Sequence, residues 1–104
     1  MLLSTTPWIE GKKIVKHLGL VRGNTIRARH LGRDIMAGFR NIVGGEISDY
    51  TKMMAESREQ SIDRMVEEAK GLGANAIVGI NFSTSMMMSS AAEILVFGTA
   101  VIVE

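Results

Sequence analysis

Residues 94–103 read Ile-Leu-Val-Phe-Gly-Thr-Ala-Val-Ile-Val, and this stretch decides the fold. Successive side chains of a β-strand point to opposite faces of the sheet. One face of this strand would carry Ile94, Val96, Ala100 and Ile102, and the other would carry Leu95, Phe97, Val101 and Val103. A strand that is apolar on both faces needs other elements to cover it on both sides.

A second strand and a long helix are predicted upstream. Apolar residues alternate with polar or small ones over 76–83, which favours a strand buried mainly on one face. Helical spacing of apolar residues predicts a helix over 50–72, with Ser48 or Asp49 as its N-cap. The sequence Gly71-Leu72-Gly73 is typical of a helix C-terminus.

Arg58 falls in the middle of the apolar stripe predicted for this helix. The stripe consists of Met54, Ile62, Met65, Ala69 and Leu72. Burying a guanidinium in such a place lowers the stability of the fold unless the group is paired with an opposite charge and hydrogen-bonded. Asp34, Glu93 or a carboxylate of a neighbouring subunit could be its partner, so Arg58 is predicted to lie in a buried ion pair that fixes register or subunit docking.

The first third of the chain is predicted to contain short elements. Residues 14–21 and 25–31 read as strands joined by a turn at Gly23-Asn24. Apolar spacing over 33–43 predicts a short amphipathic helix. A loop or hairpin end from Met86 to Ala92 connects the last two strands.

These elements predict a single α+β domain over residues 1–104, with one long and one short helix packed on an antiparallel sheet. The long helix can cover one face of the last strand. If the short helix does not reach the other face, another subunit must cover it, because apolar patches of this kind are rarely left in water. The patterning therefore favours a homo-oligomer.

Composition excludes several classes of function. The chain has no cysteine, so thiol catalysis, disulfides and thiolate metal sites are absent, and a reducing, cytoplasmic setting fits. A formal net charge of +1 argues against a nucleic-acid binder. No export signal is visible, and no apolar run approaches the roughly 20 residues that span a bilayer. No arrangement of Ser, His and acidic residues supports catalysis, so an enzyme is not expected.

Motifs along nearly the whole chain together resemble the YbjQ-like family. They are Ser4-Thr5-Thr6-Pro7, Arg33-Asp34, Ala37 to Gly45, Tyr50, Ala55, Arg58-Glu59, Leu72 to Gly79, and Gly98-Thr99-Ala100-Val101. The resemblance implies a small α+β subunit with a dodecin-like β-α-β-β core, assembled into a ring-shaped homopentamer. The family carries a heavy-metal-binding label, and in a chain without cysteine such a site must use His, carboxylate or Met.

The weak metal candidates are His30 and Asp34, with symmetry-related chains supplying further ligands. The alternative is a surface histidine and an ion-paired aspartate. Met86 and Met88 could share a face and bind Cu(I) through their thioethers, although adaptable packing is the commoner use of methionine. His17 is expected to be structural or on the surface.

A second candidate site is an inter-subunit pocket for a small anionic or polar ligand, lined by Arg33, Asp34, Arg40 and Arg58. The sequence therefore predicts a non-enzymatic homopentameric binding or assembly module, with a metal ion or small anion at its subunit junctions. The alternative is a purely structural oligomer that presents a protein-interaction surface. Neither nucleic acid nor a membrane is an expected partner.

Overall fold

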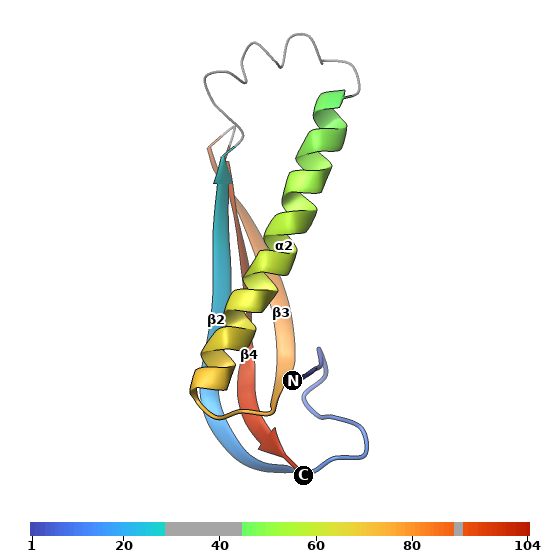
Figure 1. Ribbon diagram of the computed structural model, residues 1–104, viewed down its shortest axis with the longest axis vertical. Coiled ribbons are helices and arrows are strands. Elements are labelled where there is room, and N and C mark those ends of the chain that lie inside the picture. The colour runs from blue at the N-terminus through green and yellow to red at the C-terminus, as the bar shows by residue number, and fades with distance from the viewer. Residues whose placement is uncertain (29–44, 89–90) are drawn as a thin grey trace.

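The computed structural model describes residues 1–28, 45–88 and 91–104. In these ranges one helix lies across one face of a four-stranded sheet, which makes the fold α+β (Figure 1). The elements are β1 (Leu2–Leu3), β2 (Ile14–Ala28), α2 (Gly45–Gly71), β3 (Ala76–Met88) and β4 (Ala91–Val103). The strand order is β1-β3-β4-β2, and β1 runs parallel to β3 while the other pairs are antiparallel. The sheet is therefore mixed, and the prediction of an antiparallel sheet is wrong for β1. The short helix predicted over 33–43 lies outside the described residues.

The last strand lies in the interior of the sheet. β4 pairs with β3 on one side and with β2 on the other. Its residues Val96 and Ala100 are fully buried beneath α2, in a core completed by residues of β2, α2 and β3. These other core residues are Val21, Met65, Ala69, Ile77 and Ile80.

The opposite face of β4 is covered only at one end. There Val101 and Val103 form a smaller cluster with Ala76 and Val78, and Ile9 and Ile14 pack against it. Farther along the same face, Leu95 and Phe97 are only partly buried. The sequence predicts that another element covers this second face of β4. Among the described residues, the N-terminal segment covers one end of the face, and no element covers the rest of it.

The hairpin predicted at Gly23-Asn24 is wrong. β2 is one continuous strand whose ladder with β4 runs from the pair Ile14 and Val103 to the pair Ala28 and Ala91. Gly23 serves close packing: a Cβ atom there would lie 2.1 Å from the carbonyl oxygen of Ser61. Glycine therefore marks the point where α2 touches the backbone of β2.

The hairpin end predicted from Met86 to Ala92 is confirmed, since β3 and β4 pair antiparallel here, but its predicted bounds are too wide. β3 continues to Met88, and β4 begins at Ala91. Met86 pairs with Ala92 and Met88 with Ala91, so ladder hydrogen bonds hold these residues in the sheet. Residues 89 and 90 lie outside the described ranges.

The predicted C-terminus of the long helix is confirmed. Gly73 has a φ of 88°, and its N–H donates to the carbonyl of Lys70 at 3.0 Å. The N–H of Ala74 donates to the carbonyl of Ala69 at 3.1 Å, which completes a Schellman motif. The predicted start is wrong, because α2 begins at Gly45 and both proposed N-caps lie inside the helix. Among the described residues, no helix has the length and apolar character needed to cross a membrane.

The buried face of α2 is narrower and more polar than predicted. Ser57, Ser61, Met65 and Ala69 follow one another every four residues, and all are fully buried. Small side chains are needed here because α2 approaches β2 closely at Gly23. Thr25 supports the same contact: its hydroxyl lies 3.1 Å from that of Ser61, which donates to the carbonyl of Ile94 at 3.3 Å.

Asn75 joins the turn after α2 to the end of β4. Its side-chain amide donates to the carbonyl oxygen of Val103 at 2.9 Å and accepts from the N–H of Val103 at 2.7 Å. We expect Asn75→Ala to lower the free energy of unfolding by about 1–3 kcal/mol in urea titrations, because both bonds disappear from a partly buried site. Asn24→Ala removes one exposed hydrogen bond, to Glu93, and should cost less than about 0.5 kcal/mol. Equal losses for the two variants would contradict this role of Asn75.

Candidate functional site

Most residues of the predicted sites fall where the structure is not described. His30, Arg33, Asp34 and Arg40 all lie in the range 29–44. The proposed metal ligands and the proposed anion pocket thus remain predictions. Of the residues proposed for the metal and anion sites, Arg58 belongs to the described part of the chain, as do the Cu(I) candidates Met86 and Met88 at the end of β3.

Arg58 is exposed, so the prediction of a buried guanidinium is wrong for the single chain. The buried stripe of α2 is centred on Ser57 and Ser61, which places the neighbouring Arg58 on its outer side. Glu93 is not its partner, because Glu93 accepts a hydrogen bond from Asn24 and alternates along β4 with Ile94, which is buried beneath α2. An exposed Arg58 is available to a ligand or to a neighbouring subunit.

Within residues 1–28, 45–88 and 91–104, no group of three or more His, Cys, Asp or Glu side chains is arranged to hold a metal ion. His17 lies on β2 and is exposed, as predicted for a surface residue. The buried hydroxyls of Thr25 and Ser61 have hydrogen-bond partners inside the fold. These hydroxyls therefore serve packing, because they bond to each other and to the carbonyls of Ser57 and Ile94, and none of these groups can activate a hydroxyl as a histidine or carboxylate would.

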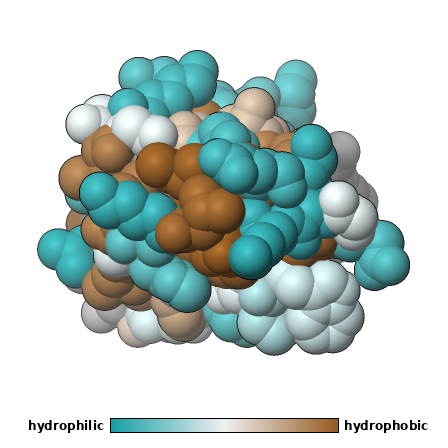
Figure 2. Space-filling model, turned by 90° about the horizontal axis from the view of Figure 1, so that it is seen from below, coloured by the Kyte–Doolittle hydropathy of each residue, from teal (hydrophilic) through white to brown (hydrophobic). Residues whose placement is uncertain are grey.

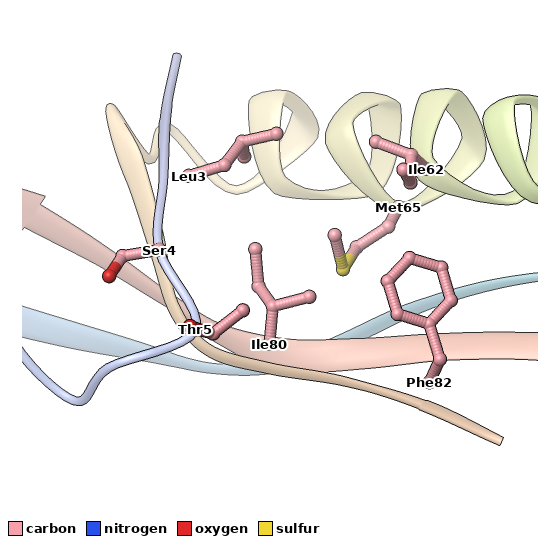
Figure 3. Close-up of a pocket in the computed structure, with 7 residues that line it drawn as sticks. All are labelled: Leu3, Ser4, Thr5, Ile62, Met65, Ile80 and Phe82. Carbon is pink, nitrogen blue, oxygen red and sulfur yellow. The ribbon is translucent and has the colours of Figure 1, made fainter.

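A hollow of 150 Å³ lies between α2, β3 and the N-terminal segment (Figure 3). Three stretches that are far apart in the sequence line it: Leu3, Ser4 and Thr5; Ile62 and Met65; and Ile80 and Phe82. We call this hollow the α2–β3 groove. It exists because α2 packs mainly over β2 and β4 and leaves the helix side of β3 largely uncovered.

The groove is apolar in character. The Phe82 ring stands beside the Met65 side chain, and the Ser4 hydroxyl points away from the space between them (Figure 3). None of the lining residues is titratable. The groove can therefore hold apolar groups, and it offers no acid, base or charge for chemistry.

The motif Ser4-Thr5-Thr6-Pro7 builds one wall of the groove. The Ser4 N–H donates to the carbonyl of Ile77 at 3.0 Å, and the Ser4 carbonyl accepts from the N–H of Ile80 at 3.1 Å. The hydroxyls of Ser4 and Thr6 lie 2.6 Å apart, and the Thr6 hydroxyl also donates to the carbonyl of Trp8 at 2.8 Å. The role of this motif, which is to hold the N-terminal segment against β3 through hydrogen bonds, could not be seen in the sequence.

Comparisons with known proteins agree with the resemblance seen in the sequence. The YbjQ family model, described as "Putative heavy-metal-binding", matches residues 1–104. A UPF0145 protein of Methanosarcina acetivorans is 56% identical over 101 residues, which cover 97% of this chain and 95% of that protein. A UPF0145 protein of Dehalococcoides mccartyi is 58% identical over 104 residues, which cover 100% of both chains.

A solved structure shares the fold. It is a Pediococcus pentosaceus protein of unknown function in the DUF74 family, with a TM-score of 0.69 and 14% identity, over 100% of this chain and 98% of that one. At this identity the likeness concerns the fold alone. The match along the whole length, together with relatives that are 56% and 58% identical, shows that this chain belongs to the YbjQ family, whose curated relatives carry the name UPF0145.

Proposed function

We propose that the protein is a non-enzymatic binding or assembly module that works as a ring-shaped homopentamer in the cytoplasm. In this proposal, a metal ion or a small anion occupies the junctions between subunits. The main support for assembly is that large apolar side chains, several of them on the sheet, are exposed to solvent in the single chain.

The elongated shape supports assembly. The radius of gyration is 17.3 Å, against about 13 Å expected for a compact chain of this length. The principal extents are 55 × 21 × 17 Å. An elongated chain exposes more surface than a compact chain of the same length, so it has more surface with which to contact neighbouring copies. The order β2, α2, β3 and β4 along the chain also agrees with the dodecin-like β-α-β-β core that the resemblance implies.

Exposed apolar side chains occur on several surfaces. Leu20 and Ile26 on β2 are 62% and 57% exposed, and Met86 on β3 is 61% exposed. Figure 2 shows a further group of apolar side chains, at the end of the molecule where α2 ends. Hydrophilic side chains surround this group. Contiguous apolar surface of this kind marks protein contacts in soluble proteins.

The proposed ligand would be bound by residues from more than one subunit. Exposed Arg58, together with Arg33 and Arg40, supplies positive charge for a small anion. His30 and Asp34 supply nitrogen and oxygen donors for a metal ion, in agreement with the description of the family. Two such ligands per subunit suffice only when neighbouring subunits contribute the others.

Native mass spectrometry tests this proposal. We expect the mass of five subunits at micromolar concentration, and stoichiometric uptake of Zn²⁺ or phosphate when each is added separately. The variant His30→Ala should lose Zn²⁺ uptake, whereas the matched control His17→Ala should keep it. A monomeric mass would overturn the assembly, and failure of Zn²⁺ and phosphate to bind would overturn the proposed ligands.

The second candidate function is a purely structural oligomer that presents an interaction surface to another protein. The exposed apolar side chains of the sheet support it, because they could contact another protein without any bound ion. A pentamer that takes up neither ion would support this candidate.

A further inference from the structure

We infer that the α2–β3 groove is a binding site for a small neutral molecule whose apolar body is about the size of one aromatic ring. The groove is formed within a single chain, so the inference does not rest on the metal ion or anion proposed above. It rests on how the groove is built, on its volume and on the chemistry of its lining.

A bulge in β3 turns apolar side chains into the groove. The pairing of β3 with β4 shifts register between Val78 and Asn81, and Gly79 in this interval has a φ of 64°. Before the bulge, Val78 belongs to the cluster on the far side of the sheet. After it, Ile80 packs into the main core and Phe82 lines the groove. Bulges are common beside functional sites, where they re-aim side chains in this way.

The N-terminal wall of the groove is fixed in place. The Ser4 N–H donates to the carbonyl of Ile77 at 3.0 Å, and the Ser4 carbonyl accepts from the N–H of Ile80 at 3.1 Å. A third backbone bond, from the Gly79 N–H to the Thr6 carbonyl at 2.9 Å, continues this contact. A ligand therefore meets a site that is already formed, and binding does not require the wall to become ordered.

The volume of the groove sets the size of the ligand. The hollow measures 150 Å³. In another protein, an apolar cavity of about 150 Å³ lined by Leu, Ile and Phe side chains binds benzene. Leu3 and Phe82 on the walls are 44% and 47% exposed, so the groove opens to solvent and a ligand can enter it without unfolding the chain. A single six-membered ring fits this space and covers both side chains.

The lining sets the charge of the ligand. None of the lining residues is titratable, so a charged group in the groove would lose its hydration and gain no partner. The Met65 side chain stands beside the Phe82 ring (Figure 3). Thioethers and aromatic rings both make favourable contacts with a further aromatic ring. The groove therefore favours a neutral aromatic molecule.

Backbone groups at the open side of the groove allow the ligand one polar substituent. The Ile80 N–H points away from β4 toward the N-terminal segment, and backbone groups alternate along a strand. The N–H and C=O of Phe82 therefore point to the same side. In the described ranges, the N-terminal segment pairs with β3 no farther than Ile80. These groups of Phe82 can bond to a hydroxyl or amide on the ring that enters the groove.

NMR spectroscopy of the methionine methyl groups tests the inference, with benzyl alcohol as the probe. We expect the ε-methyl resonance of Met65 to shift during the titration, with a dissociation constant on the order of 1 mM or lower. The ε-methyl resonance of Met54, which lies farther along α2 outside the groove, should stay in place. Benzoate has a similar size and a negative charge, so it should bind at least roughly tenfold more weakly.

Two variants locate the binding site. Thr5 lines the groove and is exposed, so Thr5→Phe can fill the hollow with a ring of its own and should abolish the Met65 response. Ser85→Phe is the matched control: Ser85 pairs with Glu93, which alternates along β4 with Ile94 beneath α2, so the same ring is added to the opposite face of the sheet. This control should keep the response. Circular dichroism checks that both variants are folded.

The inference would be overturned if Met65 in the wild-type protein did not respond to benzyl alcohol, or if Thr5→Phe bound it as tightly as the wild-type protein does. A Met65 resonance that responds to protein concentration and not to benzyl alcohol would show that another copy of the chain fills the groove. That result would also overturn the inference.

Discussion

Replacing Gly23 by alanine is expected to lower the free energy of unfolding by about 3 kcal/mol, a large effect for the addition of one methyl group. The new Cβ atom would lie 2.1 Å from the carbonyl oxygen of Ser61 and 2.6 Å from the backbone nitrogen of Met65. Both obstacles are backbone atoms, so neither can turn aside as the end of a flexible side chain would. α2 must therefore move away from β2, and the contacts of Ser57, Ser61 and Met65 with the sheet loosen together.

Gly71→Ala is the matched control for this prediction. Gly71 is the last residue of α2, and an added Cβ atom there meets nothing within 4 Å. Alanine favours the helix more than glycine does, so this variant should be as stable as the wild-type protein or up to ~1 kcal/mol more stable. Urea unfolding followed by circular dichroism at one fixed protein concentration measures both changes. Equal stabilities of the Gly23 and Gly71 variants would show that α2 does not approach β2 as closely as described.

Met65→Ala is expected to cost about 2–5 kcal/mol, the range for deleting a large side chain from a core. Met65 is fully buried and belongs to the main hydrophobic cluster between α2 and the sheet. It also lines the α2–β3 groove, so its removal enlarges an existing hollow. The surrounding backbone is held by α2 on one side and by the sheet ladder on the other, which limits collapse into the new space.

Lys52→Ala serves as the control for Met65→Ala. It deletes a side chain of comparable length from an exposed position on α2, the same helix. The expected change is within about 0.5 kcal/mol, because little buried surface is lost. Thermal unfolding at the same protein concentration compares the two variants. A loss of about 2 kcal/mol or more from Lys52→Ala, matching that from Met65→Ala, would contradict the burial pattern, since both positions would then contribute equally to the core.

The elements that could be predicted from the sequence are those whose signal is local. The alternating apolar faces of residues 94–103 predicted a strand that is covered on both sides, and the glycines after Ala69 predicted the end of α2. Gly23 was misinterpreted as a turn because glycine signals a turn and a close approach in the same way. What distinguishes the two is Ser61, which lies 38 positions later in the chain and above Gly23 in space.

The buried face of α2 was missed for a related reason. A stripe of Met, Ile and Leu suggests a core, whereas two serines suggest solvent. Here the small volume of Ser57 and Ser61 matters more than their polarity, because α2 touches the backbone of β2 and the hydroxyl of Ser61 bonds inside the fold. The displacement of the stripe is what moved Arg58 from the predicted core to the surface.

The α2–β3 groove could not be predicted because its lining comes from three distant stretches of the chain. The regular alternation over 76–83 also misplaced Phe82: it put this residue on the face of Ala76 and Val78, but the register shift between Val78 and Asn81 turns Ile80 and Phe82 to the helix side. The residues of the predicted metal and anion sites, His30, Arg33, Asp34 and Arg40, lie outside the described ranges, so those sites stay predictions.

Two side chains of α2 cap the outer backbone edge of β2. A carboxylate oxygen of Glu68 accepts from the N–H of Arg22 at 2.8 Å, and the Arg64 guanidinium donates to the carbonyl of Asn24 at 2.7 Å. An open sheet edge is a template on which the strand of another chain can pair, and such pairing leads to fibrous aggregates. The charged side chains of α2 therefore protect the middle of this edge against fibre formation.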